Sequence, residues 1–422
     1  MDIIKKCHEF YSDSEYAKSL GYTSNPRTLQ ALGLYPFFIP ISHSEGTEII
    51  IDHRKFIMIG SNNYLGMTSH PKVKEAAIQA IKCYGTGCTG SRLLNGTLDI
   101  HLQLEEKLAD FLGKEKALVF STGYQTNLGT ITSLIKKGDL ILADKKCHAS
   151  IIDAIFLAHS QKYMLMRYFK HNDMTDLLKI ISRYPENQNK LIIVDGVYSM
   201  GGDIARLPEI IPLCKKHNAI LMVDDAHGIG VLGEGRGTPH HFQCTENIHL
   251  IMGTFSKSFA SIGGFIAGTK EMIHWIQHLA RSFIFSASLP PASVATVLAV
   301  LDILYKEPEH VKRVNTIAET MRSELTTLGF DIGRSQTPVI PIIIGDQFKT
   351  VQAWKILYEE GIFTNVALPP AVASDASLLR TSYMATHTDE QIDKVLQAFK
   401  TLKSKLKPSR FQKQKNEVTI HE

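Results

Sequence analysis

The chain has 422 residues, and its 46 basic and 42 acidic side chains leave a formal net charge of only +4. This balance argues against a nucleic-acid partner, because phosphate backbones select strongly basic surfaces. With 44% apolar and 21% charged residues, the composition is that of a globular protein with a large core, and it excludes a disordered or fibrous chain.

The cysteines and the N-terminus favour a reducing cytoplasm. The six cysteines are scattered without a C-x-x-C pair, and Met1–Lys6 lacks the apolar core of a signal peptide. Residues 282–301 carry no formal charge over about the length of a membrane-spanning helix. Because Pro290-Pro291 interrupts this stretch, we predict a buried helix that starts at Ala292 and ends before Pro308.

In chain order, the sequence predicts an N-terminal arm, a hairpin and a helix before the main body. Strand patterns at 48–52 and 55–59 would form the hairpin, and Pro71 opens a helix that runs to Tyr84. The segment Gly85–Gly90 then matches G-x-G-x-x-G. A dinucleotide site requires a strand before these glycines, whereas here a helix precedes them. We therefore interpret the segment as a loop whose glycines let another group come close to the backbone.

Beyond residue 115, short apolar runs alternate with helical patterns. The candidate buried strands are 117–120, 140–142, 191–194, 219–223 and 249–252. This alternation predicts an α/β fold with a mostly parallel central sheet and helices on both faces. Ligands of such sheets bind beyond the carboxyl ends of the strands, so the residues that follow each strand are the candidates for a site.

Three of these strand ends carry residues suited to chemistry. Gly123 and Tyr124 follow the first strand at the start of a helix, whose free N–H groups suit a phosphate. His148 follows the second strand in a charged turn, where an ordinary surface histidine is the alternative. Asp224 and His227 follow the fourth strand and could serve a divalent metal, but no third ligand cluster accompanies them, so we expect no metal site.

Lys257 lies in the run Gly253–Gly264 and is the only formal charge between Glu246 and Lys270. The simplest interpretation of this segment alone is that Lys257 is an exposed lysine in a loop. The alternative is an amine held away from water, which lowers its pKa and makes it nucleophilic. Together with the acid, the histidines and the phosphate-suited turn, this lysine fits an aldehyde cofactor that has a phosphate group and a basic ring nitrogen.

The C-terminal part predicts a second, smaller α/β domain. It contains a strand pattern at 338–344, a helix at 351–360 and a last helix whose capping box joins Thr388 to Gln391. We divide the chain into an N-terminal arm and hairpin (1–60), a large cofactor-binding domain (61–290), a C-terminal domain (291–408) and a basic, polar tail (409–422). That tail is expected to be disordered.

Seven motifs carry a resemblance to a known family: Val223–Gly233 (V-D-D-A-H-G-I-G-V-L-G), Gly253–Ser258, Gly85–His101, Phe120–Asn127, Leu250–Phe265, Phe285–Ala295 and Met384–Thr388. They resemble the α-oxoamine synthases, fold-type-I pyridoxal phosphate enzymes that join an amino acid to an acyl-CoA with loss of carbon dioxide. The resemblance covers about residues 45–400 and, within the family, is strongest to the bacterial serine palmitoyltransferases.

The resemblance implies a role for each matching residue. Lys257 would bind the cofactor covalently and later move the proton of the substrate Cα, while Asp224 would pair with the ring nitrogen. Around the cofactor, His148 would stack on the ring, His227 and Ser199 would reach the ring oxygen, and the phosphate would be held by Gly123, Tyr124, Thr254 and Ser256. Arg380 would hold the substrate carboxylate. Two contacts would reach the neighbouring subunit: Asn62 or Asn63 its substrate, and Ser286 or Ser288 its phosphate.

The same resemblance implies the partners. The protein would be a homodimer with active sites at the interface, using pyridoxal 5'-phosphate, L-serine and palmitoyl-CoA, and it would produce 3-oxosphinganine for sphingolipid synthesis. Peripheral contact with the inner face of a membrane is compatible with such a product. The run Leu94–Thr97 after Arg92 favours serine. The alternatives are alanine or glycine with a shorter acyl-CoA, as in 8-amino-7-oxononanoate synthase or glycine C-acetyltransferase. Leu368, where some of the serine enzymes have arginine, leaves Arg380 as the one expected carboxylate clamp.

Overall fold

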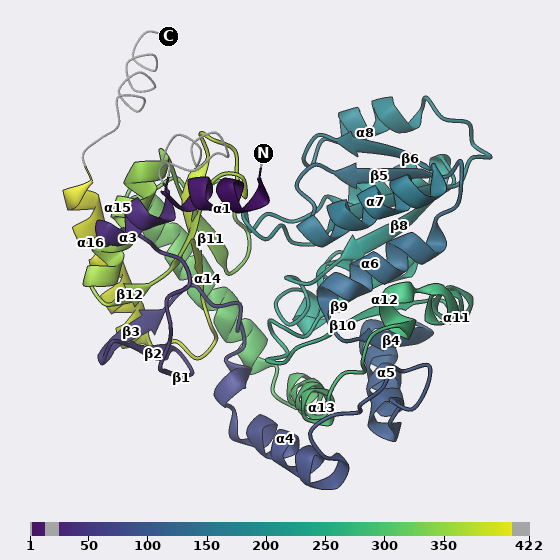
Figure 1. The fold of residues 1–422 in the computed structure, drawn as a ribbon, viewed down its shortest axis with the longest axis horizontal. Helices are drawn as coiled ribbons and strands as arrows, with labels where there is room; N and C mark the ends of the chain where they lie inside the picture. Colours follow the sequence, from purple (N-terminus) through teal and green to yellow (C-terminus); the bar gives the residue numbers. More distant parts are fainter. Residues whose placement is uncertain (1, 13–24, 407–422) are drawn as a thin grey trace.

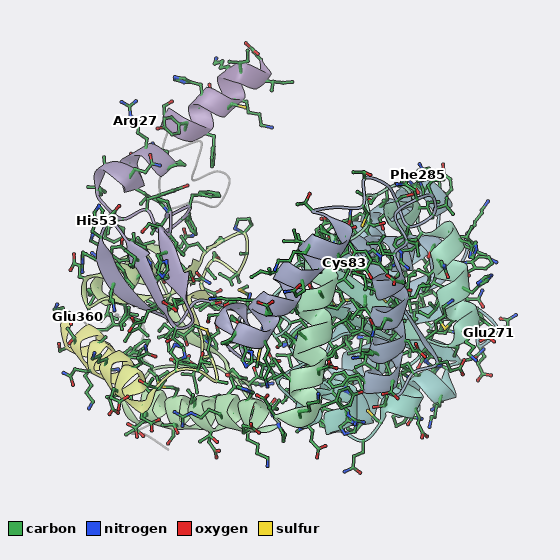
Figure 2. All side chains as sticks on the ribbon, turned by 90° about the horizontal axis from the view of Figure 1, so that it is seen from below. Arg27, His53, Cys83, Glu271, Phe285 and Glu360 are labelled. Carbon is green, nitrogen blue, oxygen red and sulfur yellow. The ribbon has the colours of Figure 1, made fainter. Side chains whose placement is uncertain are left out.

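The computed structural model describes residues 2–12 and 25–406, and these form two lobes that lie side by side (Figure 1). Figure 2 shows His53 and Glu360 on the smaller lobe and Cys83, Glu271 and Phe285 on the larger one. The predicted tail at 409–422 and part of the predicted arm lie outside the described residues.

The larger lobe is built on a seven-stranded sheet with the order β4-β10-β9-β8-β7-β5-β6. Its strands are β4 (Lys116–Phe120), β5 (Leu140–Asp144), β6 (Leu165–Phe169), β7 (Lys190–Asp195), β8 (Ala219–Asp224), β9 (Leu250–Thr254) and β10 (Gly264–Gly268). The strands from β6 across to β9 pair in parallel, and β10 pairs antiparallel with both β4 and β9. The predicted mostly parallel sheet is thus confirmed. Strand β6 is not among the predicted strands, because this edge strand exposes alternate residues and has no continuous apolar run.

Helices cover both faces of this sheet, as predicted. Because successive strand residues point to opposite faces, the sheet contributes side chains to two separate cores. Ile192 and Leu221 belong to the core that packs against α5, α9 and α13, whereas Ile193 and Met222 belong to the core under α6, α7 and α11. The helices of this lobe are α4 (Pro71–Tyr84), α5 (Asp99–Leu112), α6 (Gly123–Leu134), α7 (Ala149–Lys162), α8 (Met174–Ile181), α9 (Leu207–Lys216), α10 (Thr238–His241), α11 (Lys270–Leu279), α12 (Arg281–Ile284) and α13 (Pro291–Lys306). Short 3-10 turns occur at η1 (Met67–Ser69), η2 (Gly233–Gly235) and η3 (Thr245–Asn247).

Two sequence interpretations are confirmed in this lobe. Helix α4 precedes Gly85–Gly90, so these glycines do not follow a strand as a dinucleotide site requires. The uncharged stretch becomes α12 and α13, and α13 is interior on one side, with Val294, Val297 and Leu301 fully buried. None of the helices in residues 2–12 and 25–406 combines the length and apolar character that a membrane span needs.

The smaller lobe combines the C-terminal part of the chain with its N-terminal part. It contains α14 (Glu309–Thr327), β11 (Val339–Gly345), α15 (Gln347–Glu359), β12 (Ile362–Phe363), β13 (Asn365–Ala367), β14 (Ser377–Ser382) and α16 (Asp389–Lys405), together with α1 (Ile3–Ser12), α3 (Pro26–Ala31), β1 (His43–Glu45), β2 (Glu48–Ile51) and β3 (Arg54–Met58). The predicted hairpin is β2–β3, and β3 pairs in parallel with β12. The N-terminal hairpin therefore shares a sheet with β12 from the C-terminal part of the chain. The division of the chain into four domains stays a prediction. The capping box of Thr388 and Gln391 is present in α16.

Candidate active site

A cavity of about 370 Å³ opens at the carboxyl ends of the parallel strands. Its walls come from the segments that follow β4, β5, β7, β8 and β9, which is the edge where such sheets bind ligands. The lining residues are Thr122, Gly123, Tyr124, Asn127, His148, Ser150, Asp195, Val197, Asp224, Ala226, His227, Met252, Thr254, Ser256, Lys257, Ile262 and Gly263. We call this space the inner cavity.

A second space of about 460 Å³, the outer cavity, lies between the two lobes. It shares His148, His227 and Lys257 with the inner cavity, so these three side chains separate the two spaces. The smaller lobe supplies Arg380 and the loop around Leu368, and the larger lobe supplies Ser199. A molecule in the outer cavity would therefore meet Lys257 directly.

The amine of Lys257 has a lowered pKa of about 8, chiefly because the surrounding protein removes it from water. Asp224 opposes this effect by attracting the ammonium, whereas the positive charge of Arg380 adds to it. A lysine with this pKa is a far better nucleophile at neutral pH than an exposed one. The surface-loop interpretation of Lys257 is therefore wrong, and its amine is available for covalent chemistry.

Asp224 is buried at the end of β8 and is held by two hydrogen bonds. Asn127 on α6 donates from Nδ2 to Asp224 Oδ2 at 2.7 Å, and the Ala226 backbone N–H donates to Oδ1 at 3.1 Å. Asp195 lies directly opposite Asp224 in the β7–β8 register. Burial, with a further contribution from Asp224, raises the pKa of Asp195 well above its usual value.

The two histidines between the cavities are also held in place. Tyr64 Oη lies 2.7 Å from His227 Nδ1, and His148 Nδ1 lies 2.8 Å from Ser150 Oγ. Burial lowers the pKa of both imidazoles, and Lys257 lowers that of His227 further. At neutral pH both rings are therefore neutral hydrogen-bonding groups.

One end of the inner cavity is suited to an anion. Thr122 caps α6 by accepting a hydrogen bond from the Gln125 N–H, and Gly123 begins the helix. The hydroxyls of Thr254 and Ser256 lie 3.0 Å apart beside it. A Cβ atom at Gly123 would come within 2.8 Å of Thr254 Oγ1, so this position needs glycine. A helix N-terminus with two hydroxyls is a typical phosphate site.

Arg380 presents a charged group to the outer cavity from β14. Its Nε donates to the Ser199 carbonyl at 2.7 Å, and its Nη2 donates to Asn62 Oδ1 at 2.8 Å. The guanidinium is buried and has no acidic partner among these contacts, so it can bind a carboxylate from a substrate.

The structure gathers most of the residues that the sequence analysis selected. Gly123, Tyr124, His148, Asp224, His227, Thr254, Ser256 and Lys257 line the inner cavity, and Asn62, Ser199 and Arg380 line the outer one. Three selected residues line neither cavity of this chain. Asn63 donates from Nδ2 to Thr68 Oγ1 at 2.8 Å, Gln125 Nε2 donates to Ser286 Oγ at 3.0 Å, and the Ser288 backbone N–H donates to the Gly90 carbonyl at 2.9 Å.

The sequence analysis assigned no role to Asn127, Ser150, Asp195 and Tyr64, although all four surround the site. Asn127 ends the motif Phe120–Asn127, and Asp195 follows a predicted strand, so both offered a signal. Ser150 lies two residues after His148 in the segment that follows a predicted strand, so it offered a signal as well. Tyr64 offered none, since its contact with His227 joins distant segments.

The inner cavity fits pyridoxal phosphate. Lys257 can react with its aldehyde, Asp224 can pair with its ring nitrogen, and the start of α6 can hold its phosphate. Asn127 Oδ1 is buried without a hydrogen-bond partner within the described residues, so a polar ligand would satisfy it.

Comparison with known proteins agrees with this fit. The model of the aminotransferase class I and II family matches residues 54–399, and the chain belongs to that family. Within it, the chain is a pyridoxal phosphate-dependent acyltransferase of the α-oxoamine synthase type. The predicted family, fold and cofactor are confirmed.

Its relatives include several enzymes of one kind. The chain is 51% identical to serine palmitoyltransferase of Bacteriovorax stolpii over 87% of both chains. It is 46% identical to that of Sphingobacterium spiritivorum over 92% of this chain and 96% of the relative. A solved serine palmitoyltransferase of Sphingomonas wittichii superposes with a TM-score of 0.88 at 36% identity, covering 95% of this chain and 98% of that one. An 8-amino-7-oxononanoate synthase of Thermoanaerobacter pseudethanolicus is 40% identical over 90% of this chain and 95% of the relative.

Proposed function

We propose that the protein condenses L-serine with palmitoyl-CoA, with loss of carbon dioxide, to give 3-oxosphinganine and coenzyme A as the first step of sphingolipid synthesis. The observation that carries this proposal is the meeting of the two cavities at Lys257, with Arg380 facing the same space. The names of the relatives at 46% and 51% identity support serine as the amino acid.

When bound, pyridoxal phosphate supplies an electron sink for negative charge at the Cα of the amino acid. The protein's part is placement and proton transfer. Asp224 would keep a proton on the ring nitrogen, and Asn127 fixes the direction of that carboxylate. Lys257 would first hold the cofactor and then move the proton of the substrate Cα, for which a pKa of about 8 is suited.

The outer cavity is the proposed site of both substrates. Arg380 would bind the serine carboxylate, and Asn62 would keep the guanidinium turned towards it. Part of the wall is apolar and includes Phe37, Val366 and Leu368. Such a wall suits the acyl end of the thioester and would exclude water from the new carbon–carbon bond.

A homodimer is part of this proposal. Four apolar side chains are exposed in the single chain: Ile262 lines the inner cavity, and Leu93, Leu94 and Phe285 lie on the two segments that the Ser91–Ala287 bridge joins. A second copy would cover this patch. It would also give Ser286, which lines neither cavity of its own chain, a partner active site to serve, whereas Asn63 is buried and bonded to Thr68 within its own chain.

The second candidate is condensation of alanine or glycine with a shorter acyl-CoA. It is kept because 8-amino-7-oxononanoate synthases are 40–42% identical to this chain. In both functions the reaction is the same, and the substrates differ only in size and polarity. Peripheral membrane contact and a cytoplasmic location stay predictions.

A substrate matrix tests the proposal. Serine, alanine and glycine are each combined with palmitoyl-CoA, a short acyl-CoA and pimeloyl-CoA, and the release of the free thiol is followed. We expect the pair of serine and palmitoyl-CoA to have the highest kcat/KM. Turnover of alanine with pimeloyl-CoA but not of serine would overturn the serine assignment in favour of the second candidate.

A further inference from the structure

A cluster of nitrogen and oxygen donors lies outside the active site, where three helices meet. His70 directly precedes α4, Glu307 directly follows α13, and His310 lies in the first turn of α14. One donor atom from each of the three side chains lies within 4.8 Å of the other two. In the described part of the chain, this is the one cluster of three or more such donors at that spacing.

The cluster has two features that favour a ligand. His70 Nδ1 is buried and has no hydrogen-bond partner among residues 2–12 and 25–406, which is costly unless a ligand satisfies the nitrogen. His310 Nε2 and Glu307 Oε2 lie 3.4 Å apart, a long hydrogen-bonding contact whose spacing is also close to that between neighbouring tetrahedral ligands with Zn–N and Zn–O bonds of about 2.1 Å.

Lys72 orients the carboxylate of this cluster. Its Nζ lies 2.6 Å from Glu307 Oε1, so Oε1 is engaged and Oε2 faces His310. The ammonium costs the site some affinity for a cation, since like charges repel. Because Lys72 engages Oε1, only Oε2 of Glu307 is left to bind a metal.

We infer that His70, Glu307 and His310 form a binding site for a divalent transition-metal ion of the zinc type. Two imidazoles and one carboxylate are a common set of three protein ligands for Zn²⁺, with the fourth position left to water. Mg²⁺ prefers oxygen ligands and would not compete. This site is independent of the proposed function, and no residue of either cavity belongs to it.

The ion would link the start of α4 to the short connection between α13 and α14. Helix α14 packs in the core of the larger lobe through Val311 and Val314 and in that of the smaller lobe through Ile317 and Met321. His310 lies at its start, so a metal bound also by His70 would fix α14 to the entrance of α4. Because the ion would bind only the folded chain, it would stabilise this junction between the lobes.

The experiment measures zinc binding to the holoenzyme without a polyhistidine tag. His274 and His278 form an exposed pair on α11 with ring centroids 4.3 Å apart, and such a pair binds metals by itself. The double variant His274→Ala/His278→Ala therefore serves as the background. We expect it to bind one zinc per chain in equilibrium dialysis, and zinc at about 100 times Kd to raise Tm by about 2–5 °C.

Three further variants in this background test the ligand set. His70→Gln and His310→Gln should each lose the bound zinc and the shift in Tm. Lys72→Met should bind zinc several-fold more tightly, because it removes the neighbouring positive charge. Retention of zinc by both histidine variants, no zinc in the background protein, or an equal shift in Tm with Mg²⁺ would overturn the proposal.

Discussion

The ammonium of Lys257 is held where the surrounding protein keeps it from water while Asp224 attracts it. Desolvation is the stronger effect, and the pKa falls to about 8. His148 and His227 stay neutral beside it because burial lowers their pKa values. Neutral rings can lie close to the amine without repelling its charge, so the site combines a reactive amine with groups that orient what it binds.

This pKa predicts how the cofactor-free enzyme captures pyridoxal phosphate. At pH 7 a lysine with a pKa of about 8 is roughly one-tenth neutral, whereas an exposed one is neutral in roughly one molecule in 3000. The capture rate, followed by absorbance, should therefore rise with pH, reach half its maximum near pH 8 and level off above about pH 9.

The matched variants for this prediction are Lys257→Ala and Lys270→Ala. Lys270 is an exposed lysine at the start of α11. After borohydride reduction, only the Lys257→Ala protein should fail to retain the cofactor covalently. Equal retention by both variants would assign the covalent bond to another amine.

At the scale of elements, the start of α6 provides the anion end of the inner cavity. The backbone reaches the ligand there because Gly123 has no side chain and β10 packs closely behind it. A Cβ atom at Gly264 would lie 2.6 Å from the Gly123 Cα, so the strand and the helix start are in close contact. The helix start therefore cannot retreat to make room for a larger residue.

We predict that Gly123→Ala weakens pyridoxal phosphate binding at least tenfold, because its methyl group would meet Thr254 Oγ1 at 2.8 Å and narrow the anion end. Fluorescence titration of the cofactor-free protein measures the Kd. Gly87→Ala is the matched control, since no heavy atom lies within 4 Å of a Cβ atom at that position. A similar loss in both variants would contradict a role for the α6 start.

A second element-scale feature joins three loops beside the site. His171, which follows β6, lies 3.0 Å from Asp144 Oδ1 at the end of β5 and 2.7 Å from Asp203 Oδ2 after β7. Burial opposes the charged imidazole, but the hydrogen bonds to the two carboxylates outweigh it and raise the pKa of His171 to about 9. This ion triad ties together the loops that carry His148 and Ser199.

The raised pKa gives a pH dependence with a definite sign. The charged His171 stabilises the folded state fully below its unfolded pKa of about 6.5, and this contribution is lost as the pH rises through about 9. Tm should thus fall more steeply between pH 7 and 9.5 in the parent protein than in His171→Ala.

That variant should also lose about 2 kcal/mol of stability at pH 7, because it leaves two carboxylates without their partner. His53→Ala, at an exposed position, is the control and should keep the parent profile in chemical denaturation. Identical pH profiles for the parent protein and His171→Ala would refute the role of the triad.

At the scale of the whole molecule, the exposed apolar patch of Leu93, Leu94, Ile262 and Phe285 predicts the assembly. Phe285 and Leu94 are 70% and 79% exposed in the single chain, and Phe285 lies at the edge of the larger lobe (Figure 2). Removing such side chains from water is a main driving force for association. The cavities would then be completed only in the dimer.

We predict that Leu94→Asp shifts the protein from dimer to monomer in analytical ultracentrifugation and lowers its affinity for pyridoxal phosphate. A buried, unpaired charge at the interface would oppose association. Phe348→Asp, at an exposed apolar residue of α15 away from the patch, should leave the dimer intact. A parent protein that is already monomeric at micromolar concentration would refute the dimer.

The sequence by itself determined the elements and the order of the chemical groups along the chain. Apolar runs of strand length predicted five strands of the large sheet, and Lys257, Asp224 and His148 could be selected because each follows such a run. These signals are local, since burial on both faces requires a continuous apolar strand. The family motifs were local as well.

Only the tertiary structure decided which distant groups meet. Tyr64 reaches His227, and Asn62 reaches Arg380, across hundreds of residues of chain. The same is true of His70 and His310. The pKa values of Lys257 and His171 also depend on desolvation and on partners from other segments. No local pattern records these effects, because they arise only when segments far apart in the sequence pack together and remove the groups from water.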